Sequence, residues 1–352
     1  MVKSHDELEL LLRVLPPRVQ EAVLEAGADE VEEVAMDLGR PLAVRASGLH
    51  RLVDFEVRSE DISYVVHRVN GFREDGRTGI ERTLHRISCV RSRYGEVVGL
   101  TIRVGRWIPG AAEPLRDLLE SGQSVLLLGP PGCGKTTVLR DAARILSERW
   151  GQKVVVVDTS NEIGGDGNIP HPAIGASRRI QVPEPSMQAR VLMQAVANHG
   201  PQVIVIDEIG YHGDAQAVCA IARRGVQMVA TAHGRVLRDL VGNPDLRQLL
   251  GMHSPDERTG DPVFGCVVEV SDRRVFRVTR DVAAATDALL RRGEMPPVEE
   301  RPALAAPARA RHPRPAPAEV PPPAARSPHV DLRNLAEAAR RWAGELRAAR
   351  VS

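Results

Sequence analysis

The residues best suited to chemistry form a glycine-rich run that ends in a lysine and two threonines. The run reads Gly129-Pro130-Pro131-Gly132-Cys133-Gly134-Lys135-Thr136, with Thr137 behind it, and it follows the apolar residues 125–128. Its spacing matches the P-loop, in which backbone N–H groups and the positive end of the following helix surround the phosphates of a nucleotide. Lys135 is one of only three lysines, and its compact ammonium reaches between two phosphates. Thr136 is placed to ligate Mg²⁺, so the run predicts a site for ATP and Mg²⁺; the alternative is a glycine-rich strand-to-helix turn that binds no nucleotide.

Two adjacent acids, Asp207 and Glu208, end the β-branched residues 203–206. Such a run is typical of a buried parallel strand. Asp207 is predicted to hold Mg²⁺ through water, as a Walker B aspartate does, and Glu208 to polarise the attacking water. The alternative is that two acids at a strand end are a solvated edge or the N-cap of a helix.

Apolar runs and helical stretches alternate through the middle of the chain. Strands are expected at 124–128, 153–158, 203–208 and 227–232, and helices at 134–150, 186–199 (with Ser186 as its cap) and 213–224. This alternation, with both strand faces apolar, predicts an α/β fold with a doubly wound parallel sheet. Ligands of such sheets bind at the carboxyl ends of the strands, where Asp158, Asp207 and His233 lie. Residues 263–270 and 275–278, joined around Asp272-Arg273, predict a hairpin that completes the domain.

The 352 residues, 43% of them hydrophobic, are enough for two or three domains. We expect a small α+β domain at residues 1–110 and the P-loop ATPase domain at residues 111–292. In the first, the pattern predicts two strands within 31–46, a helix from Ser59 to about 69, a capped helix from Thr78 through 89 and a strand at 96–104. Residues 293–330 contain eleven prolines and predict a disordered linker. Residues 331–350 predict an amphipathic helix that docks to a partner or to the rest of the protein, or a marginal helix without a target.

The net charge of +1 conceals a basic block, because residues 68–106 hold nine arginines against four acids. This block is suited to nucleic-acid phosphates or to an acidic neighbouring subunit, and the alternative is a solvated arginine-rich surface. The four cysteines lack C-x-x-C spacing, so neither a disulfide framework nor a zinc site is predicted. No apolar stretch reaches membrane-spanning length and no signal peptide is visible, so we expect a soluble, cytoplasmic protein without a transmembrane segment.

Six motifs together give the chain a family resemblance. They read GIERTLHRIS (79–88), GPPGCGKTT (129–137), DTSNEIGGDG (158–167), IPHPAIGASRRIQVP (169–183), VIVIDEIG (203–210) and TAHG (231–234). The region from 79 to about 291 resembles the stage III sporulation protein AA family and its cyanobacterial and plastid relatives, P-loop ATPases related to secretion ATPases. The resemblance implies a RecA-like ATPase that often forms a hexameric ring and has a small N-terminal domain. Many relatives also end in a single-stranded nucleic-acid-binding module with an Arg-x-x-x-His signature, which does not occur after residue 300 here.

The resemblance also implies roles for residues that the pattern alone leaves open. Glu162 corresponds to an acid near the γ-phosphate and competes with Glu208 as the activator of water; the alternative is a loop carboxylate. His233 resembles a sensor that bonds the γ-phosphate or the catalytic glutamate, although a lone histidine is more often structural. Arg178 and Arg179, which we expect on a loop that leads away from the site of their own subunit, are candidate arginine fingers that reach the nucleotide of the next subunit. The alternative is a surface pair.

The sequence therefore predicts an ATPase that uses Mg-ATP hydrolysis to move a ring or a partner, as a homo-oligomer of six subunits by family likeness. Three alternatives stay open: a motor of a secretion or channel complex at a membrane, a nucleic-acid-dependent ATPase that acts through residues 68–106, and an ATP-gated assembly scaffold with little turnover. ATPase rates with and without single-stranded DNA or RNA separate them.

Overall fold

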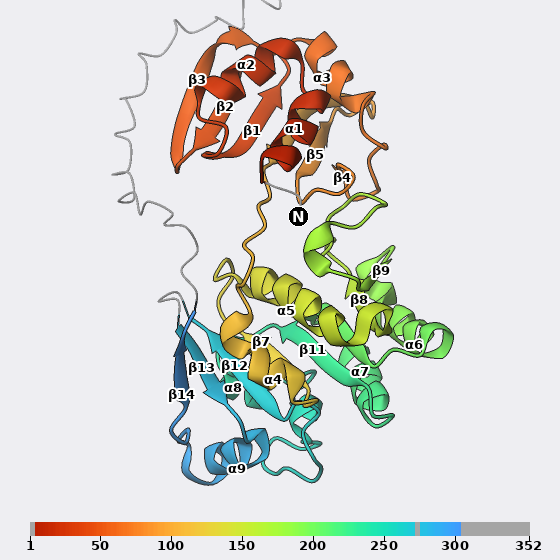
Figure 1. Ribbon diagram of the computed structural model, residues 1–352, viewed down its shortest axis with the longest axis vertical. Helices are drawn as coiled ribbons and strands as arrows, with labels where there is room; N and C mark the ends of the chain where they lie inside the picture. The colour runs from red at the N-terminus through yellow and green to blue at the C-terminus, as the bar shows by residue number, and fades with distance from the viewer. Residues whose placement is uncertain (1–3, 272–274, 304–352) are drawn as a thin grey trace, which may run out of the picture. The chain divides into compact units, whose positions relative to one another are not determined.

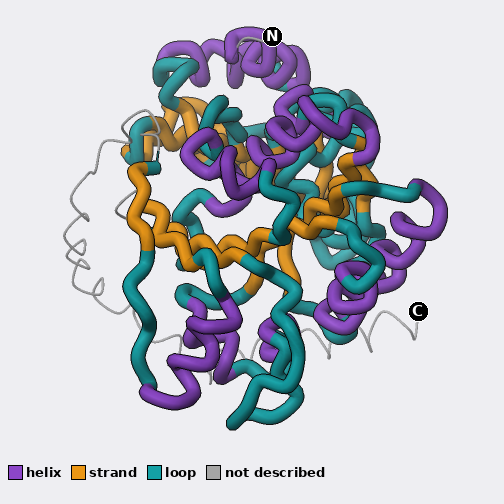
Figure 2. Tube along the Cα trace, turned by 60° about the horizontal axis from the view of Figure 1, so that its bottom comes forward, coloured by secondary structure: helices purple, strands orange, loops and turns teal. Residues whose placement is uncertain are grey.

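The computed structural model describes residues 4–271 and 275–303, which form two β-sheets (Figures 1 and 2). Residues 304–330 of the predicted linker and the predicted helix 331–350 lie outside the described residues. So does the Asp272-Arg273 turn of the expected hairpin.

The first sheet is antiparallel and has six strands in the order β3-β2-β1-β6-β5-β4. Its elements are α1 (Ser4–Val14), α2 (Pro17–Glu25), β1 (Val31–Asp37), β2 (Pro41–Ala46), β3 (Leu49–Glu56), α3 (Ser59–Val66), β4 (Arg77–Gly79), β5 (Arg86–Arg91) and β6 (Val97–Arg103). Alternate strand residues such as Val34, Val44 and Ile102 are fully buried in one core with residues of all three helices. Period-two burial of this kind covers one face of a sheet, and it confirms a small α+β domain before the P-loop.

Three details of this domain differ from the sequence expectation. Residues 78–89 are not a helix, because Gly79 ends β4 and β5 begins at Arg86. The supposed capping residue Glu81 instead accepts the backbone N–H groups of Asn168 and Ile169, from a distant loop. Helices α1 and α2 and strand β3 were not predicted at all.

The second sheet has eight strands in the order β14-β13-β12-β7-β11-β10-β8-β9, and its strands from β12 to β9 are parallel. Its strands are β7 (Val125–Leu128), β8 (Val154–Asp158), β9 (Arg178–Gln181), β10 (Val203–Ile209), β11 (Gln227–Ala232), β12 (Cys266–Val270), β13 (Val275–Thr279) and β14 (Glu299–Pro302). Its helices are α4 (Arg116–Glu120), α5 (Lys135–Trp150), α6 (Gln188–His199), α7 (Asp214–Ala222), α8 (Leu237–Gly242) and α9 (Val282–Arg292).

Both faces of this sheet are covered by helices. In β10, Val203 and Val205 are buried in the same core as residues of α4 and α5. Ile204 and Ile206 are buried in a second core with residues of α6, α7, α8 and α9. Strands that bury both faces read as continuous apolar runs, which is why the sequence pattern was strong here. The doubly wound α/β fold is confirmed.

Three predictions about this part of the chain were wrong in detail. Residues 299–302, assigned to the linker, form β14, which pairs with β13 and carries Arg301 in ion pairs with Asp117 and Glu299. Arg178 and Arg179 belong to the edge strand β9 and not to a loop. Ser186 does not cap α6, whose first residue is Gln188.

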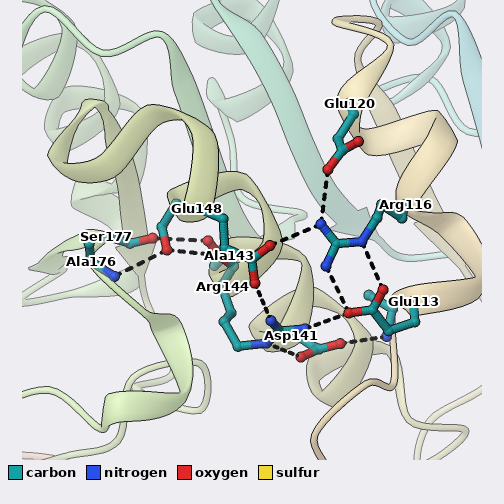
Figure 3. Close-up of polar contacts among 11 residues, drawn as sticks. Glu113, Arg116, Glu120, Asp141, Ala143, Arg144, Glu148, Ala176 and Ser177 are labelled. Atoms are coloured by element: carbon teal, nitrogen blue, oxygen red, sulfur yellow. Dashed lines mark hydrogen bonds and ion pairs between the residues drawn. The ribbon is translucent and has the colours of Figure 1, made fainter.

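A network of ion pairs fixes the segment before β7 on the helix that follows the P-loop (Figure 3). Arg116 bonds Glu113, Glu120 and Glu148. Arg144 of α5 bonds Glu113 as well, together with Asp141 and Glu148. The two guanidinium groups, Arg116 first, lower the pKa of Glu113 to about 2. A shared network of this kind holds its members in place better than isolated surface pairs do.

Candidate functional site

A cleft of about 520 Å³ brings together most of the residues that the sequence singled out. Its lining consists of Gly129, Pro131, Gly132, Lys135 and Thr136 from the P-loop, Ser160 and Glu162 after β8, Asp207 and Glu208 of β10, and Thr231, Ala232, His233, Gly234, Arg235 and Asp239 from the end of β11 onward. The strands β8, β10 and β11 are parallel neighbours of one sheet, so their carboxyl ends meet at one edge. Pro130, Cys133, Gly134 and Thr137 belong to the loop or to the start of α5 but lie outside this lining.

The P-loop backbone takes a shape that requires glycine at Gly129 and Gly134. Their φ angles are +153° and +102°, and a Cβ on Gly129 would stand 2.4 Å from the Val270 carbonyl oxygen. Gly134 is the N-cap of the 16-residue helix α5, so the helix begins at the cleft with its unpaired N–H groups and positive dipole end. The Lys135 ammonium is half-buried and donates to the carbonyls of Gly129 (2.6 Å) and Pro130 (3.1 Å).

Two buried carboxylates lie at this edge of the sheet, Asp207 in the lining of the cleft and Asp158 at the end of β8. Burial, followed by the charges of Asp158 and Glu162, raises the pKa of Asp207. Burial also raises the pKa of Asp158, which accepts the N–H groups of Ile163 (3.3 Å) and Gly164 (2.7 Å). Like charges that share a buried site disfavour ionisation of both groups, so this arrangement favours a cation.

The residues present fit Mg²⁺. The Thr136 hydroxyl and the Asp207 carboxylate, both in the lining of the cleft, are hard oxygen ligands of the kind that Mg²⁺ prefers. Within residues 4–271 and 275–303, no group of three or more His, Cys, Asp or Glu side chains could hold a metal by itself.

Two glutamates border the cleft from different strands. The Glu208 carboxylate is 34% exposed, and its Oε1 lies 3.4 Å from Nε2 of His233, which is 75% exposed. His233 and Glu208 therefore lie side by side at the edge of the cleft. Glu162 is 47% exposed and its Oε1 lies 3.1 Å from Nη1 of Arg86.

Behind these groups lies a buried residue that the sequence analysis missed, Gln188. Its Nε2 donates to the carbonyl of Glu208 (2.7 Å) and to the carboxylate of Asp214 (2.7 Å), and its Oε1 accepts the hydroxyl of Thr159. Gln188 thus joins the ends of β8 and β10 to the start of α7. The only signal in the sequence is a polar residue at the head of an otherwise apolar helix stripe.

The two candidate arginine fingers do not line the cleft of their own chain. Arg178 is exposed at the first position of β9. Arg179 is partly buried, and its guanidinium donates to the carbonyls of Gly164, Gly165, Gly167 and Asn168. The structure therefore gives Arg179 a local task, which is to hold the loop between β8 and β9.

Sequence comparisons relate the chain to one protein family. A model of the family described as sporulation stage III, protein AA matches residues 83–257. The chain is 45% identical to the protein ycf45 of Porphyra purpurea and 44% identical to the protein SEEDLING PLASTID DEVELOPMENT 1 of Arabidopsis thaliana, each time over 84% of this chain. The matches cover 56% and 46% of those proteins, so the chain spans about half of their length.

A shorter relative is matched over most of its length. The chain is 31% identical to the stage III sporulation protein AA of Bacillus subtilis, over 68% of this chain and 86% of that protein. Among solved structures, the Legionella pneumophila ATPase DotB superposes with a TM-score of 0.53 at 16% identity, over 80% of this chain and 89% of that one, which shows a shared fold. No helix in the described part of the chain is long and apolar enough to cross a membrane.

Proposed function

Because this chain belongs to the family of stage III sporulation protein AA, we propose that it binds Mg-ATP in the cleft beside the P-loop and hydrolyses it. One observation carries the proposal: Lys135 and Thr136 line the same cleft as Asp207 and Glu208. These four residues supply a cation that can bind phosphates, two oxygen ligands for a metal ion and a candidate base within one site. Phosphoryl transfer to water needs this set of groups.

The chain's own residues divide the work as follows. The N–H groups of the P-loop and Lys135 bind the β- and γ-phosphates, and Thr136 and Asp207 hold Mg²⁺. Mg²⁺, when bound, neutralises charge on the phosphate oxygens. Glu208 takes a proton from water as the water oxygen attacks the γ-phosphorus and the bond to the leaving ADP oxygen breaks. His233 orients the Glu208 carboxylate, and Glu162 is the competing base.

We propose further that the ATPase assembles as a homohexameric ring, in the manner that the family likeness implies. Arg178 supports this, because its exposed position on an edge strand leaves it available to a neighbouring subunit. Arg179, with its four carbonyl partners, is a weaker candidate for the same task. The proposed ring would act as a motor on a substrate or partner, and a membrane complex is one setting for such a motor.

A second candidate function rests on the turn between β5 and β6. There Tyr94 is 83% exposed and directly follows the exposed Arg93, and the exposed Arg91 ends β5 three positions earlier. An exposed aromatic ring near arginines can stack on a base while the charges meet phosphates. Single-stranded DNA or RNA should then raise the ATPase rate, and Tyr94→Ala should remove that increase without changing the basal rate.

The main test compares four variants of the full chain in ATP binding and hydrolysis. Lys135→Ala should abolish binding or hydrolysis, whereas Lys153→Ala, which changes an exposed lysine of the same chain, should not. Glu208→Gln should still bind Mg-ATP but hydrolyse it on the order of a hundredfold more slowly. If Glu162→Gln shows that phenotype instead, the two glutamates exchange roles. A Lys135→Ala rate within about twofold of the parent, roughly 0.4 kcal/mol in barrier, would refute the proposal.

A further inference from the structure

The N-terminal sheet contacts one residue of the proposed site, Glu162. Arg86, the first residue of β5, is 19% exposed and pairs with Glu162 of the cleft at 3.1 Å between Nη1 and Oε1. The two residues are 76 positions apart in the chain. The proposed function made no use of Arg86.

The pairing lies beside a close contact between two segments, each of which has a glycine at the point of contact. A Cβ on Gly79 of β4 would stand 2.2 Å from Cβ of Asp166, and a Cβ on Gly165 would stand 2.2 Å from the Thr83 carbonyl oxygen. Only glycine lets the β4–β5 segment and the β8–β9 loop approach this closely. The close approach fixes the start of β5 against the loop that carries Glu162.

Further polar contacts hold the same two segments together. Arg73 pairs with Asp166 at 2.9 Å. The Glu81 carboxylate accepts the N–H groups of Asn168 (3.1 Å) and Ile169 (2.6 Å). These contacts already secure the interface, and an ion pair with a half-exposed carboxylate adds little stability. The Arg86–Glu162 pair is therefore not needed to hold the segments together.

The position of the pair gives it a different task. Glu162 carries a negative charge into a cleft that already holds Asp207 and Glu208, beside the loop that would bind a triphosphate. Without a cation next to it, the Glu162 carboxylate would repel the γ-phosphate and would be free to change rotamer. A guanidinium at hydrogen-bond distance neutralises the carboxylate and fixes its direction.

We propose that Arg86 is a positioning residue for Glu162, through which the N-terminal domain controls the affinity of the cleft for the γ-phosphate. The inference rests on the proposed function, since it concerns the same site. It makes ATP binding sensitive to any movement of β5 relative to the β8–β9 loop. A nucleoside triphosphate is affected and a diphosphate is not, because only the triphosphate places a charge beside Glu162.

The test is a double-mutant cycle with Arg86→Gln, Glu162→Gln and the double variant, together with Arg86→Lys. Arg103→Gln is the matched control, because Arg103 is the register partner of Arg86 on β6 but bonds Glu33 instead. Affinities for Mg-ADP and for a slowly hydrolysed Mg-ATP analogue are measured by titration, and turnover is measured separately. Thermal unfolding reports whether each variant is folded.

Arg86→Gln should weaken binding of the ATP analogue about fivefold, the scale of one partly exposed charge pair, and leave ADP binding within about twofold. Turnover at saturating ATP should fall. In the Glu162→Gln background the same change should alter analogue binding less than about twofold, because the charge to be neutralised is gone. Arg86→Lys should retain most of the parent affinity, and Arg103→Gln should match the parent.

Three results would overturn the inference. The first is parent-like affinity of Arg86→Gln for the ATP analogue, and the second is an equal loss of affinity for ADP and for the analogue. The third is a loss of analogue affinity on Arg86→Gln that is the same whether residue 162 is Glu or Gln. A loss in Arg86→Lys as large as in Arg86→Gln would also contradict it. A parent protein that binds nucleotide without hydrolysing it would refute the proposed ATPase and leave the binding cycle to decide on Arg86. The two failures are thus distinguishable.

Discussion

Gln188→Met removes the polar connections behind the cleft while keeping nearly the same side-chain volume. In the parent, the fully buried amide of Gln188 donates to the Glu208 carbonyl and to Asp214 and accepts the Thr159 hydroxyl. Methionine can make none of these hydrogen bonds. The variant therefore tests whether this residue holds the end of β10 in place.

The size of the effect follows from the partners that lose their bonds. Asp214 keeps the N–H groups of Gly210 (3.2 Å) and Tyr211 (2.8 Å), so its carboxylate stays bonded. The Glu208 carbonyl and the Thr159 hydroxyl each lose a partner, at about 1–3 kcal/mol per buried group. We expect the free energy of unfolding to fall by about 2–6 kcal/mol in total. The unfolding temperature should fall by about 5–15 °C.

The assay is urea unfolding followed by circular dichroism, with ATP turnover measured in parallel. Gln216→Met is the control, because Gln216 is an exposed glutamine on α7 and its replacement should change stability by less than about 0.5 kcal/mol. Turnover of Gln188→Met should drop more than its Mg-ADP affinity, since the backbone of Glu208 loses its support. A stability loss of about 0.5 kcal/mol or less would refute the reasoning.

Three further predictions concern other parts of the structure. The guanidinium groups of Arg116 and Arg144 lower the pKa of Glu113 to about 2. Glu113→Gln should therefore lower the free energy of unfolding above pH about 4.5, by less than about 1 kcal/mol because the ion pairs are partly exposed. That cost should fade as the pH drops toward 2, as urea midpoints at several pH values will show; a constant difference would contradict it. In Gly165→Ala the new Cβ would meet the Thr83 carbonyl, at a φ of +83°, whereas the control Gly122→Ala has a similar φ of +82° and nothing within 4 Å of its new Cβ. Thermal melts should therefore show a larger fall in unfolding temperature for Gly165→Ala than for Gly122→Ala. Equal falls would count against the close contact. Arg178→Ala should lower the ATP turnover rate and leave the nucleotide affinity unchanged. Mixing it with Lys135→Ala subunits should restore part of the activity. Parent-like turnover of Arg178→Ala by itself would argue against an arginine that acts on the nucleotide of the next subunit.

Local pattern was enough to predict the parallel strands β7, β8, β10 and β11 of the second sheet and the glycine-rich loop that follows β7. The apolar residues 203–206 are buried on both faces of the sheet, so their strand could be recognised without knowledge of its neighbours. Gly129 and Gly134 are required by backbone angles that belong to the loop itself. Because parallel strands end at one edge, Asp207 and His233 could be placed at the same cleft from the order of elements alone.

What the tertiary structure decided depends on contacts between distant residues. Thr78 and Glu81 have the spacing of a capping box, yet Glu81 bonds backbone groups almost ninety positions away and the segment forms a strand and a turn. The sequence indicated no partner for Arg179, whereas in the folded chain its guanidinium donates to four loop carbonyls. The pairing of Arg86 with Glu162 and the bonds of Gln188 leave no periodic trace in the sequence. A hydrogen bond or ion pair is set by where the fold brings two groups together, and only the folded chain specifies that distance.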